Sequence, residues 1–177
     1  MFRAIKLVAA LAIVSVLAAC ASGVTRMDPA STPNVSTAKT EPSIKSVSIW
    51  LNEDAKKLQA ENLKFNQEEL RATVERLLVS QNLQKPGATQ LLDIEITSLR
   101  VRSAFSAIMF GFMAGNDNVE GVVSIKDANG AVLKKAKIKA SYALGGVGGG
   151  TDGARLGWLY EEFAKHAAAE VSGAPAK

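Results

Sequence analysis

The chain has 177 residues, of which 21 are lysine or arginine and 17 are aspartate or glutamate, for a formal net charge of +4. Two of the cations, Arg3 and Lys6, lie close to the first residue, so the remaining chain is nearly neutral. Basic residues do not cluster with aromatic ones, and nucleic acid is therefore excluded as an expected partner. One cysteine and one histidine exclude disulfides within the chain and a multi-histidine metal site.

The first residues have the pattern of a secretory signal peptide. Arg3 and Lys6 precede an uninterrupted apolar stretch from Leu7 to Val14, and small residues follow at 18–19, directly before Cys20. A basic start, a short apolar stretch and small residues at the cleavage site are typical of such signals. The apolar stretch is shorter than the roughly 20 residues that a membrane-spanning helix needs.

The tetrapeptide Leu17-Ala18-Ala19-Cys20 resembles the lipobox of bacterial lipoproteins. The resemblance implies that residues 1–19 are removed and that Cys20, the new first residue, is acylated on its thiol and amino group. Two or three acyl chains hold a protein stably on a membrane, because each buried methylene contributes about 0.8 kcal/mol. Ala21-Ser22 follows the cysteine in place of the aspartate that retains such lipoproteins in the inner membrane. The resemblance therefore implies the periplasmic face of the outer membrane.

Residues 20–43 are predicted to form the lipidated N-terminus and a disordered tether. They are rich in Ser, Thr, Pro and Ala and have no apolar period. A flexible chain of this length would hold the domain on the order of 25 Å from the lipid surface. Residues 44–172 are expected to form one globular periplasmic domain, and residues 173–177 a flexible tail.

Alternating apolar and polar residues predict four strands, at 46–51, 92–101, 119–125 and 132–144. In the second strand the apolar phase changes parity near Thr97-Ser98, which indicates a β-bulge. Asp127-Ala128-Asn129-Gly130 is typical of a tight hairpin turn between the last two strands. Residues 52–64 are polar and ambiguous, and fit a loop with one helical turn.

Two helices are predicted from their ends. Asn66 can cap the first helix and Glu69 stands three residues on, as in a capping box, and Lys85-Pro86-Gly87 ends the run. The second helix begins near Thr151-Asp152, carries a stripe of apolar residues, and finishes before Gly173.

The predicted order of elements is β-α-β-β-β-α. A helical crossover between the first two strands implies a parallel, right-handed pair, and the next two connections are hairpins. The sequence therefore predicts an α+β fold, a two-layer β-α-β-β-β-α domain in which two helices cover the apolar face of a mixed sheet.

Several motifs follow Arg102. They are Gly111-Phe112-Met113-Ala114-Gly115, Val119-x-x-x-Val123-x-Ile125-x-Asp127, Asn129-Gly130-x-Val132-Leu133, the glycine-rich run Gly145 to Gly150, and the closing helix. With these motifs the chain resembles an uncharacterised family of proteobacterial envelope lipoproteins, known only as a domain of unknown function. The resemblance implies a fold and an envelope location, but no activity and no cofactor, because the motifs are structural rather than catalytic.

The glycine-rich run includes Gly148-Gly149-Gly150-Thr151-Asp152-Gly153, which matches G-x-G-x-x-G between a strand and a helix. A dinucleotide site also needs a second parallel strand and an acidic residue roughly 20 residues further on. The last helix is not followed by such a strand, so a flexible connection is the favoured interpretation. A small ligand bound by the 145–153 loop remains the alternative function.

Catalytic groups are sparse. His166 is expected on the surface of the last helix, beside the apolar stripe, and no Ser in a G-x-S-x-G turn accompanies it. Asp93 and Glu95 lie on one face of a strand, where alternation alone explains them. No catalytic residue, metal site or cofactor is predicted, and an envelope enzyme is the less favoured alternative.

Lys135, Lys137 and Lys139 lie on one side of the last predicted strand. They could form a basic stripe that meets anionic headgroups or an acidic partner. Lysines on an exposed strand also guard against edge-to-edge aggregation. The second interpretation is favoured, because no aromatic residues accompany the charge.

The connection at 104–114 is unusually apolar, where polar turn residues are expected. Its large side chains are Phe105, Ile108, Met109, Phe110, Phe112 and Met113. It either folds over the core or forms an exposed patch that contacts a partner or the bilayer, and both alternatives stay open. The sequence thus predicts a non-enzymatic lipoprotein, attached to the membrane through acyl chains on Cys20 and serving as a binding or assembly module with a candidate envelope protein partner.

Overall fold

The structure, a computed structural model, describes residues 22–27, 43–62, 64–110, 113, 115–143 and 151–174. The predicted signal peptide, Cys20, the tether at 28–42, Phe112, the glycine run at 145–150 and residues 175–177 lie outside the described residues. The predictions that concern them stay predictions.

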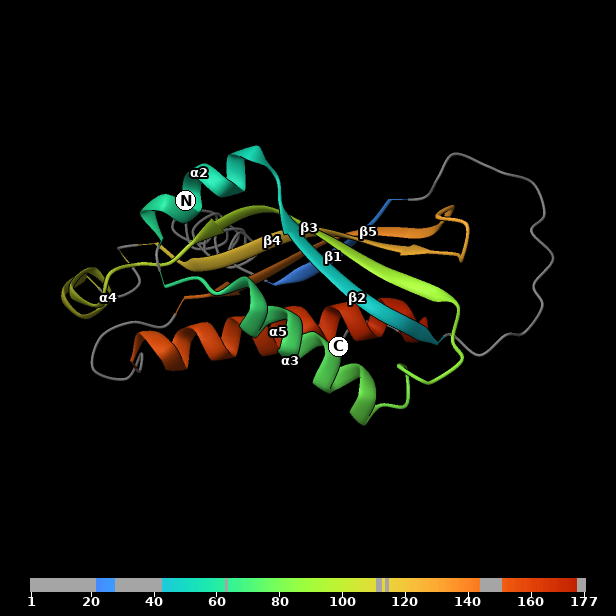
Figure 1. Ribbon diagram of the computed structural model, residues 1–177. Coiled ribbons are helices and arrows are strands. Elements are labelled where there is room, and N and C mark those ends of the chain that lie inside the picture. Colours follow the sequence, from blue (N-terminus) through green and yellow to red (C-terminus); the bar gives the residue numbers. More distant parts are fainter. Residues whose placement is uncertain are drawn as a thin grey trace, which may run out of the picture.

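A five-stranded mixed sheet forms one layer of the domain (Figure 1). Its strands are β1 (Gly23–Arg26), β2 (Ile44–Leu51), β3 (Gln90–Arg100), β4 (Asp117–Lys126) and β5 (Val132–Tyr142). Their order across the sheet is β1-β5-β4-β3-β2, with β2 and β3 parallel and every other pair antiparallel. The predicted parallel crossover and the two antiparallel connections that follow it are confirmed.

Four described helices accompany the sheet: α2 (Glu53–Glu61), α3 (Gln67–Ser80), α4 (Ala104–Phe110) and α5 (Asp152–Ser172). Figure 1 shows α3 and α5 together on one side of the sheet, α2 on the other side of the view, and α4 beyond one end. The predicted α+β class is confirmed, with β1, α2 and α4 as additions. The sequence of α2 has only a weak apolar pattern, because Ala55 is the one buried residue of this helix. The side chain of Asn52 caps α2 by accepting from the backbone N–H of Ala55 at 2.9 Å.

The predicted β-bulge lies in β3. Ile96 pairs with Gly121 and Ser98 with Glu120, so Thr97 is the extra residue. The strand opposite requires a glycine here, because a Cβ on Gly121 would lie 2.9 Å from the backbone oxygen of Glu95. The same Cβ would lie 3.1 Å from the ring of Phe163, so the missing side chain also lets α5 pack closely on the sheet.

Asn66 caps α3 as predicted, since its side chain accepts from the backbone N–H groups of Glu68 and Glu69 at 3.0 and 3.1 Å. In the expected capping box, the side chain of Glu69 would accept from the backbone N–H of Asn66, but another residue takes this place. The N–H of Asn66 donates to the hydroxyl oxygen of Tyr160 on α5, at 2.8 Å. Burial raises the pKa of Tyr160 to about 12, so the phenol stays protonated while it joins the two helices.

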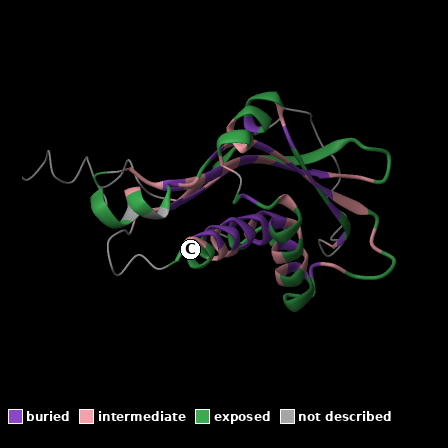
Figure 2. Cartoon of the chain, turned by 60° about the vertical axis from the view of Figure 1, so that its left-hand side comes forward, coloured by how far each residue is buried: buried purple, intermediate pink, exposed green. Residues whose placement is uncertain are grey.

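α5 is buried along most of its length (Figure 2), because it packs against β4, β5 and α3. The predicted surface position of His166 is therefore wrong. This side chain is 6% exposed, and its Nε2 lies 3.5 Å from a carboxylate oxygen of Glu162. A helix covered by a sheet and by a second helix buries residues outside a single apolar stripe.

β1 corrects the predicted tether. Residues Gly23–Arg26 pair with β5, with Val24 opposite Ile138, and Arg26 reaches Glu170 of α5 at 3.1 Å. Without this strand, the edge of β5 would leave backbone N–H and C=O groups unpaired. Disorder is therefore the wrong prediction for residues 23–26, where four residues are too few for a recognisable apolar period.

Candidate functional site

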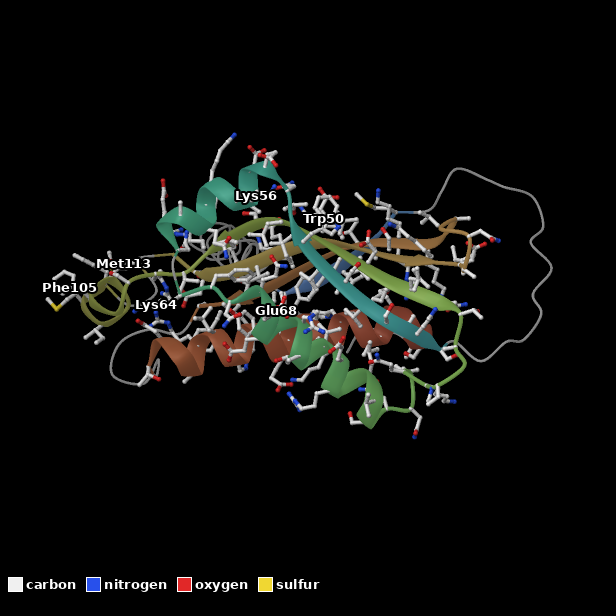
Figure 3. All side chains as sticks on the ribbon, viewed as in Figure 1. Trp50, Lys56, Lys64, Glu68, Phe105 and Met113 are labelled. Atoms are coloured by element: carbon white, nitrogen blue, oxygen red, sulfur yellow. The ribbon has the colours of Figure 1, made fainter. Side chains whose placement is uncertain are left out.

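α4 projects from the end of the sheet between β3 and β4 (Figures 1 and 3). The large side chains described in α4 and shortly after it are exposed: Phe105 by 67%, Ile108 by 56%, Met109 by 63%, Phe110 by 56% and Met113 by 79%. These five residues are called the α4 patch. The interpretation in which they fold over the core is excluded by their exposure. So many large apolar side chains close together on a surface are typical of a contact site.

The N-terminal side of α4 is set by local hydrogen bonds. The hydroxyl oxygen of Ser103 accepts from the backbone N–H of Ser106 at 3.1 Å, as the side chain of an N-cap does. On the C-terminal side, Gly115 has a φ of +82°, a region that favours glycine. A Cβ at this position would also lie 2.8 Å from the guanidinium of Arg100, which would have to shift slightly.

The base of the projection is a buried ion pair. Arg102 stands just before α4 and Asp117 just after it, with side chains 1% and 0% exposed. The backbone N–H and Nε of Arg102 donate to Oδ1 of Asp117 at 2.6 and 3.2 Å. Its Nη2 donates to Oδ2 of Asp117 at 3.1 Å. One carboxylate thus joins the two ends of the connection that carries α4.

Arg155 of α5 completes this base. Its Nε lies 2.9 Å from Oδ2 of Asp117, and its Nη2 donates to the backbone oxygen of Arg102 at 2.8 Å. Nη2 also lies 2.8 Å from Oδ1 of Asp152, whose other oxygen pairs with Lys64. We call Arg102, Asp117, Asp152 and Arg155 the charged base.

The charged base fixes geometry rather than adding much net stability. Buried ions lose their hydration, and a buried pair is often no more stable than well-packed apolar residues. Removing one partner, however, leaves a buried charge and costs about 3–5 kcal/mol. The connection is therefore held at one place on the sheet, while the α4 patch stays exposed at its tip.

The charged base is not predicted from the sequence, because its members are far apart in the chain. One signal was available. Arg155, Leu159, Phe163 and Ala167 follow one another at a spacing of four, so Arg155 continues the apolar stripe of α5. A charged residue in an apolar stripe indicates a buried ion partner.

The beginning of β1 lies at the same end of the sheet. The hydroxyl oxygen of Ser22 accepts from the backbone N–H of Ser141 at 2.9 Å. The side-chain amide of Asn116, just after α4, donates to the hydroxyl of Ser141 at 3.2 Å. Ser141 therefore touches both the start of β1 and the base of α4.

The sheet face that α3 and α5 leave uncovered carries paired charges. The carboxylate of Asp93 accepts from the hydroxyl of Ser48 at 2.6 Å and from Lys126 at 2.7 Å. Burial alone would raise the pKa of Asp93, but hydrogen bonds from Lys126, Ser48 and Trp50 outweigh it and lower the pKa below its usual value. This carboxylate serves the sheet as an ion-pair partner.

Two lysines of the basic stripe share one acidic partner. Lys137 and Lys139 lie 2.9 and 3.1 Å from the carboxylate of Glu120 on β4. Burial alone would raise the pKa of Glu120, but the two lysines lower it below its usual value. Both lysines lie opposite β1, so they do not guard a free strand edge either. The interpretation as a guard of a free edge is therefore wrong for these two residues, and contact with an anionic partner stays a prediction.

The described end of the glycine-rich segment is the first turn of α5. The hydroxyl of Thr151 caps the helix by accepting from Ala154 N at 3.3 Å, and Asp152 follows. A carboxylate at a helix N-terminus occupies the place where a phosphate would bind and repels it. Two shallow cavities of about 310 and 330 Å³ flank β1, and neither is lined by residues 151–153.

Two further findings concern only the part of the chain that the structure describes. No three His, Cys, Asp or Glu side chains come together there as a metal site. No described helix has the length and apolar character needed to cross a membrane.

The sequence matches the model of one protein family, Domain of unknown function (DUF4410), over residues 23–146. The chain therefore belongs to this family. The match begins at the first residue of β1, which agrees with the inclusion of this strand in the domain. It covers the motifs from Gly111 to Leu133 and the first half of the chain, and it ends before the closing helix. The match shows a domain of unknown function; the envelope location stays a prediction. No curated protein matches the sequence.

Two solved structures share the fold. Both are dodecamers of PelC from Paraburkholderia phytofirmans, and one carries a point substitution. The substituted PelC, in space group C2, has a TM-score of 0.52 and 12% identity, over 89% of this chain and 100% of that chain. The other, in space group P6, has a TM-score of 0.52 and 11% identity, over 86% of this chain and 98% of that chain. At this identity the likeness concerns the fold alone.

Proposed function

We propose that this member of the DUF4410 family is a non-enzymatic, lipid-anchored protein of the bacterial envelope. It is attached through Cys20 to the periplasmic face of the outer membrane and serves as a binding or assembly module. The lipobox-like sequence and the leader in front of it support the address. The α4 patch supports the activity as a module.

The exposure of the α4 patch is the observation that carries the proposal. Fully burying one large apolar side chain is worth about 1.5–3 kcal/mol. Covering the five exposed side chains of the α4 patch would therefore contribute a considerable binding free energy. The charged base beneath them keeps the connection in one position. A fixed base and an apolar tip are the arrangement expected of a contact surface.

The charged base itself supports a structural interpretation over a catalytic one. Oδ1 of Asp117 accepts from Arg102, and its Oδ2 lies against both arginines. The oxygens of Asp152 are divided between Arg155 and Lys64. A general base needs a carboxylate oxygen free to take a proton, and each of these four oxygens lies within ion-pair distance of an arginine or lysine.

The anchor is tested by Cys20→Ser in the full-length chain. We expect uncleaved precursor, or an unacylated form released from the membrane fraction, as judged by labelling with a radioactive fatty acid and by fractionation. Normal processing and unchanged membrane association of the variant would show that the anchor is wrong.

The contact surface is tested by Ile108→Ser combined with Phe110→Ser. Because both side chains are exposed, the unfolding midpoint should stay within a few degrees. Association with membranes or with a crosslinked envelope partner should be lost. Val79→Ser combined with Val132→Ser is the matched control, since both valines are exposed on other elements. Equal association of the two double variants would contradict the proposal.

Self-assembly is a second candidate, favoured by one observation. The fold is shared with PelC, which forms a dodecamer. In that case the α4 patch would contact a second copy of this chain. Sedimentation of the purified protein at increasing concentration tests it, and a monomer at every concentration would reject it.

A further inference from the structure

We propose that the α4 patch inserts into the same bilayer that holds the acyl chains of Cys20, so that the domain sits directly on the membrane. This inference rests on the lipid anchor proposed above. It replaces the long tether with a second, protein-borne membrane contact.

Very little chain separates Cys20 from the folded domain. One residue, Ala21, lies between Cys20 and Ser22 along the chain, so the Cα atoms of Cys20 and Ser22 are at most about 7 Å apart. Ser22 is held by its hydrogen bond to Ser141, and Arg26 is held by Glu170. Residues 28–42 connect β1 to β2, so they do not lie between the anchor and the domain.

Ser22 lies at the end of the sheet that carries α4. Gly23 pairs with Lys139 of β5, three residues before Tyr142, which pairs with Asp117 at the base of α4. β1 therefore starts at the end of the sheet that carries α4 and runs toward the end that carries the β4–β5 turn. An anchor two residues before Ser22 brings the bilayer to the α4 end.

The projection that carries α4 is apolar and uncharged. Between Ser103 and Asn116 the sequence has no charged residue. A helix of seven residues is about 10 Å long, too short to span a bilayer. Exposed Phe, Ile and Met side chains on such a short element suit the boundary between headgroups and acyl chains.

The bilayer explains the patch better than a protein partner does. A protein partner could approach the domain from any side, and nothing would require its site to lie beside the anchor. A membrane contact must lie at the anchored end. The α4 patch meets this requirement through Asn116, which shares Ser141 with Ser22.

A fluorescent probe at the tip tests the insertion. Met113→Cys and Asn129→Cys are made in the full-length protein, purified with its lipid and labelled with an environment-sensitive thiol dye. Acylated Cys20 has no free thiol to react. Asn129 is the control, because it is exposed at the opposite end of the sheet. The proteins are reconstituted into vesicles of phosphatidylethanolamine and phosphatidylglycerol, with or without lipid carrying a nitroxide on its acyl chain.

We expect the dye at Met113→Cys to shift to shorter wavelength and to be quenched by the nitroxide lipid, and the dye at Asn129→Cys to do neither. Protein that floats with the vesicles while both dyes behave as in water would overturn the insertion and leave the anchor intact. Protein that does not float would overturn both. A shifted dye that the nitroxide does not quench would place a second copy or another protein on the patch, and would also overturn the insertion.

A second measurement removes the acyl chains. A chain that begins at residue 20 and carries Cys20→Ser should still bind these vesicles weakly. Phe105→Ser with Ile108→Ser should lower its partition coefficient about tenfold or more, whereas Val79→Ser with Val132→Ser should leave it unchanged. Equal partition of the two would overturn the insertion. Should the first pair melt early, the probe at Met113→Cys decides, because it keeps both side chains.

Discussion

The two ends of β4 are built differently. At its first residue, Asp117 is fully buried and binds Arg102 and Arg155. At its last residue, Lys126 is partly exposed and pairs with Asp93 on the open face of the sheet. The first end carries the α4 connection, and the second leads into the β4–β5 turn.

The turn needs nothing beyond local hydrogen bonds. The side chain of Asp127 accepts from the N–H groups of Asn129 and Ala131, both at 2.9 Å, and Gly130 supplies a φ of +86°. The turn residues 127–131 include neither a buried ion pair nor a large apolar side chain, although Val132 and Leu133 at the start of β5 are exposed. Since the α4 connection has both, it does more than join two strands.

The largest expected effect is that of Asp117→Ala. It leaves two buried guanidinium groups without their carboxylate, which should cost about 3–5 kcal/mol and lower the unfolding midpoint by roughly 10 °C or more. Asp93→Ala, which removes the partner of Lys126 at the other end of β4, should cost below about 1 kcal/mol, because the Lys126–Asp93 ion pair is partly exposed. Thermal unfolding of both variants measures the difference.

Similar losses for the two variants would break the comparison. Asp117→Asn sharpens it, because the amide keeps the shape of the carboxylate but not its charge. We expect Asp117→Asn to lose most of the stability that Asp117→Ala loses, because the charge of the carboxylate holds the two arginines.

A smaller effect is expected from removing β1. A chain that begins at Ser43 loses the pairing of β1 with β5 and leaves the 5%-exposed Glu170 without Arg26. We expect a loss of about 2 kcal/mol and a midpoint lower by roughly 4–8 °C, compared with a chain that begins at Ala21. The sequence alone predicts equal midpoints for the two chains. Calorimetry decides between the two expectations.

Local patterns in the sequence predicted most of the fold. The bulge at Thr97 changes the parity of the apolar residues, Asn66 supplies a capping side chain, and Asp127 to Gly130 have the composition of a turn. Each of these features is determined by residues that are close in sequence. The parallel crossover then follows from the order of the elements.

The features that were missed depend on distant residues. β1 is stabilised by β5, more than a hundred residues further on, and four residues carry no period of their own. The charged base joins Asp117 at the start of β4 to Arg155 in the first turn of α5. The surface position predicted for His166 failed because the sheet covers more of α5 than its apolar stripe: Glu170, one turn after His166, is buried against Arg26 of β1. At 104–114 the composition indicated an unusual segment, but its exposure depends on the packing of the domain.

The smallest expected effect is a dependence on pH at the partly exposed end of β4. The pKa of Asp93 is lower in the folded chain than its usual value of 3.8, so the folded state favours the charged form. Its stabilisation is fully present above the unfolded pKa and is lost as the pH falls through the folded pKa. We expect the free energy of unfolding to fall by less than about 1 kcal/mol on this account.

Asp93→Asn is the variant that isolates this contribution, because the amide cannot titrate. Chemical unfolding from about pH 7 to about pH 3 should show a shallower loss of stability in the variant than in the unchanged chain. Glu120, whose pKa is also lowered, should still contribute in both proteins. Identical pH profiles would mean that the Lys126–Asp93 pair contributes nothing measurable, and the two ends of β4 would then differ even more than the buried and partly exposed ion pairs suggest.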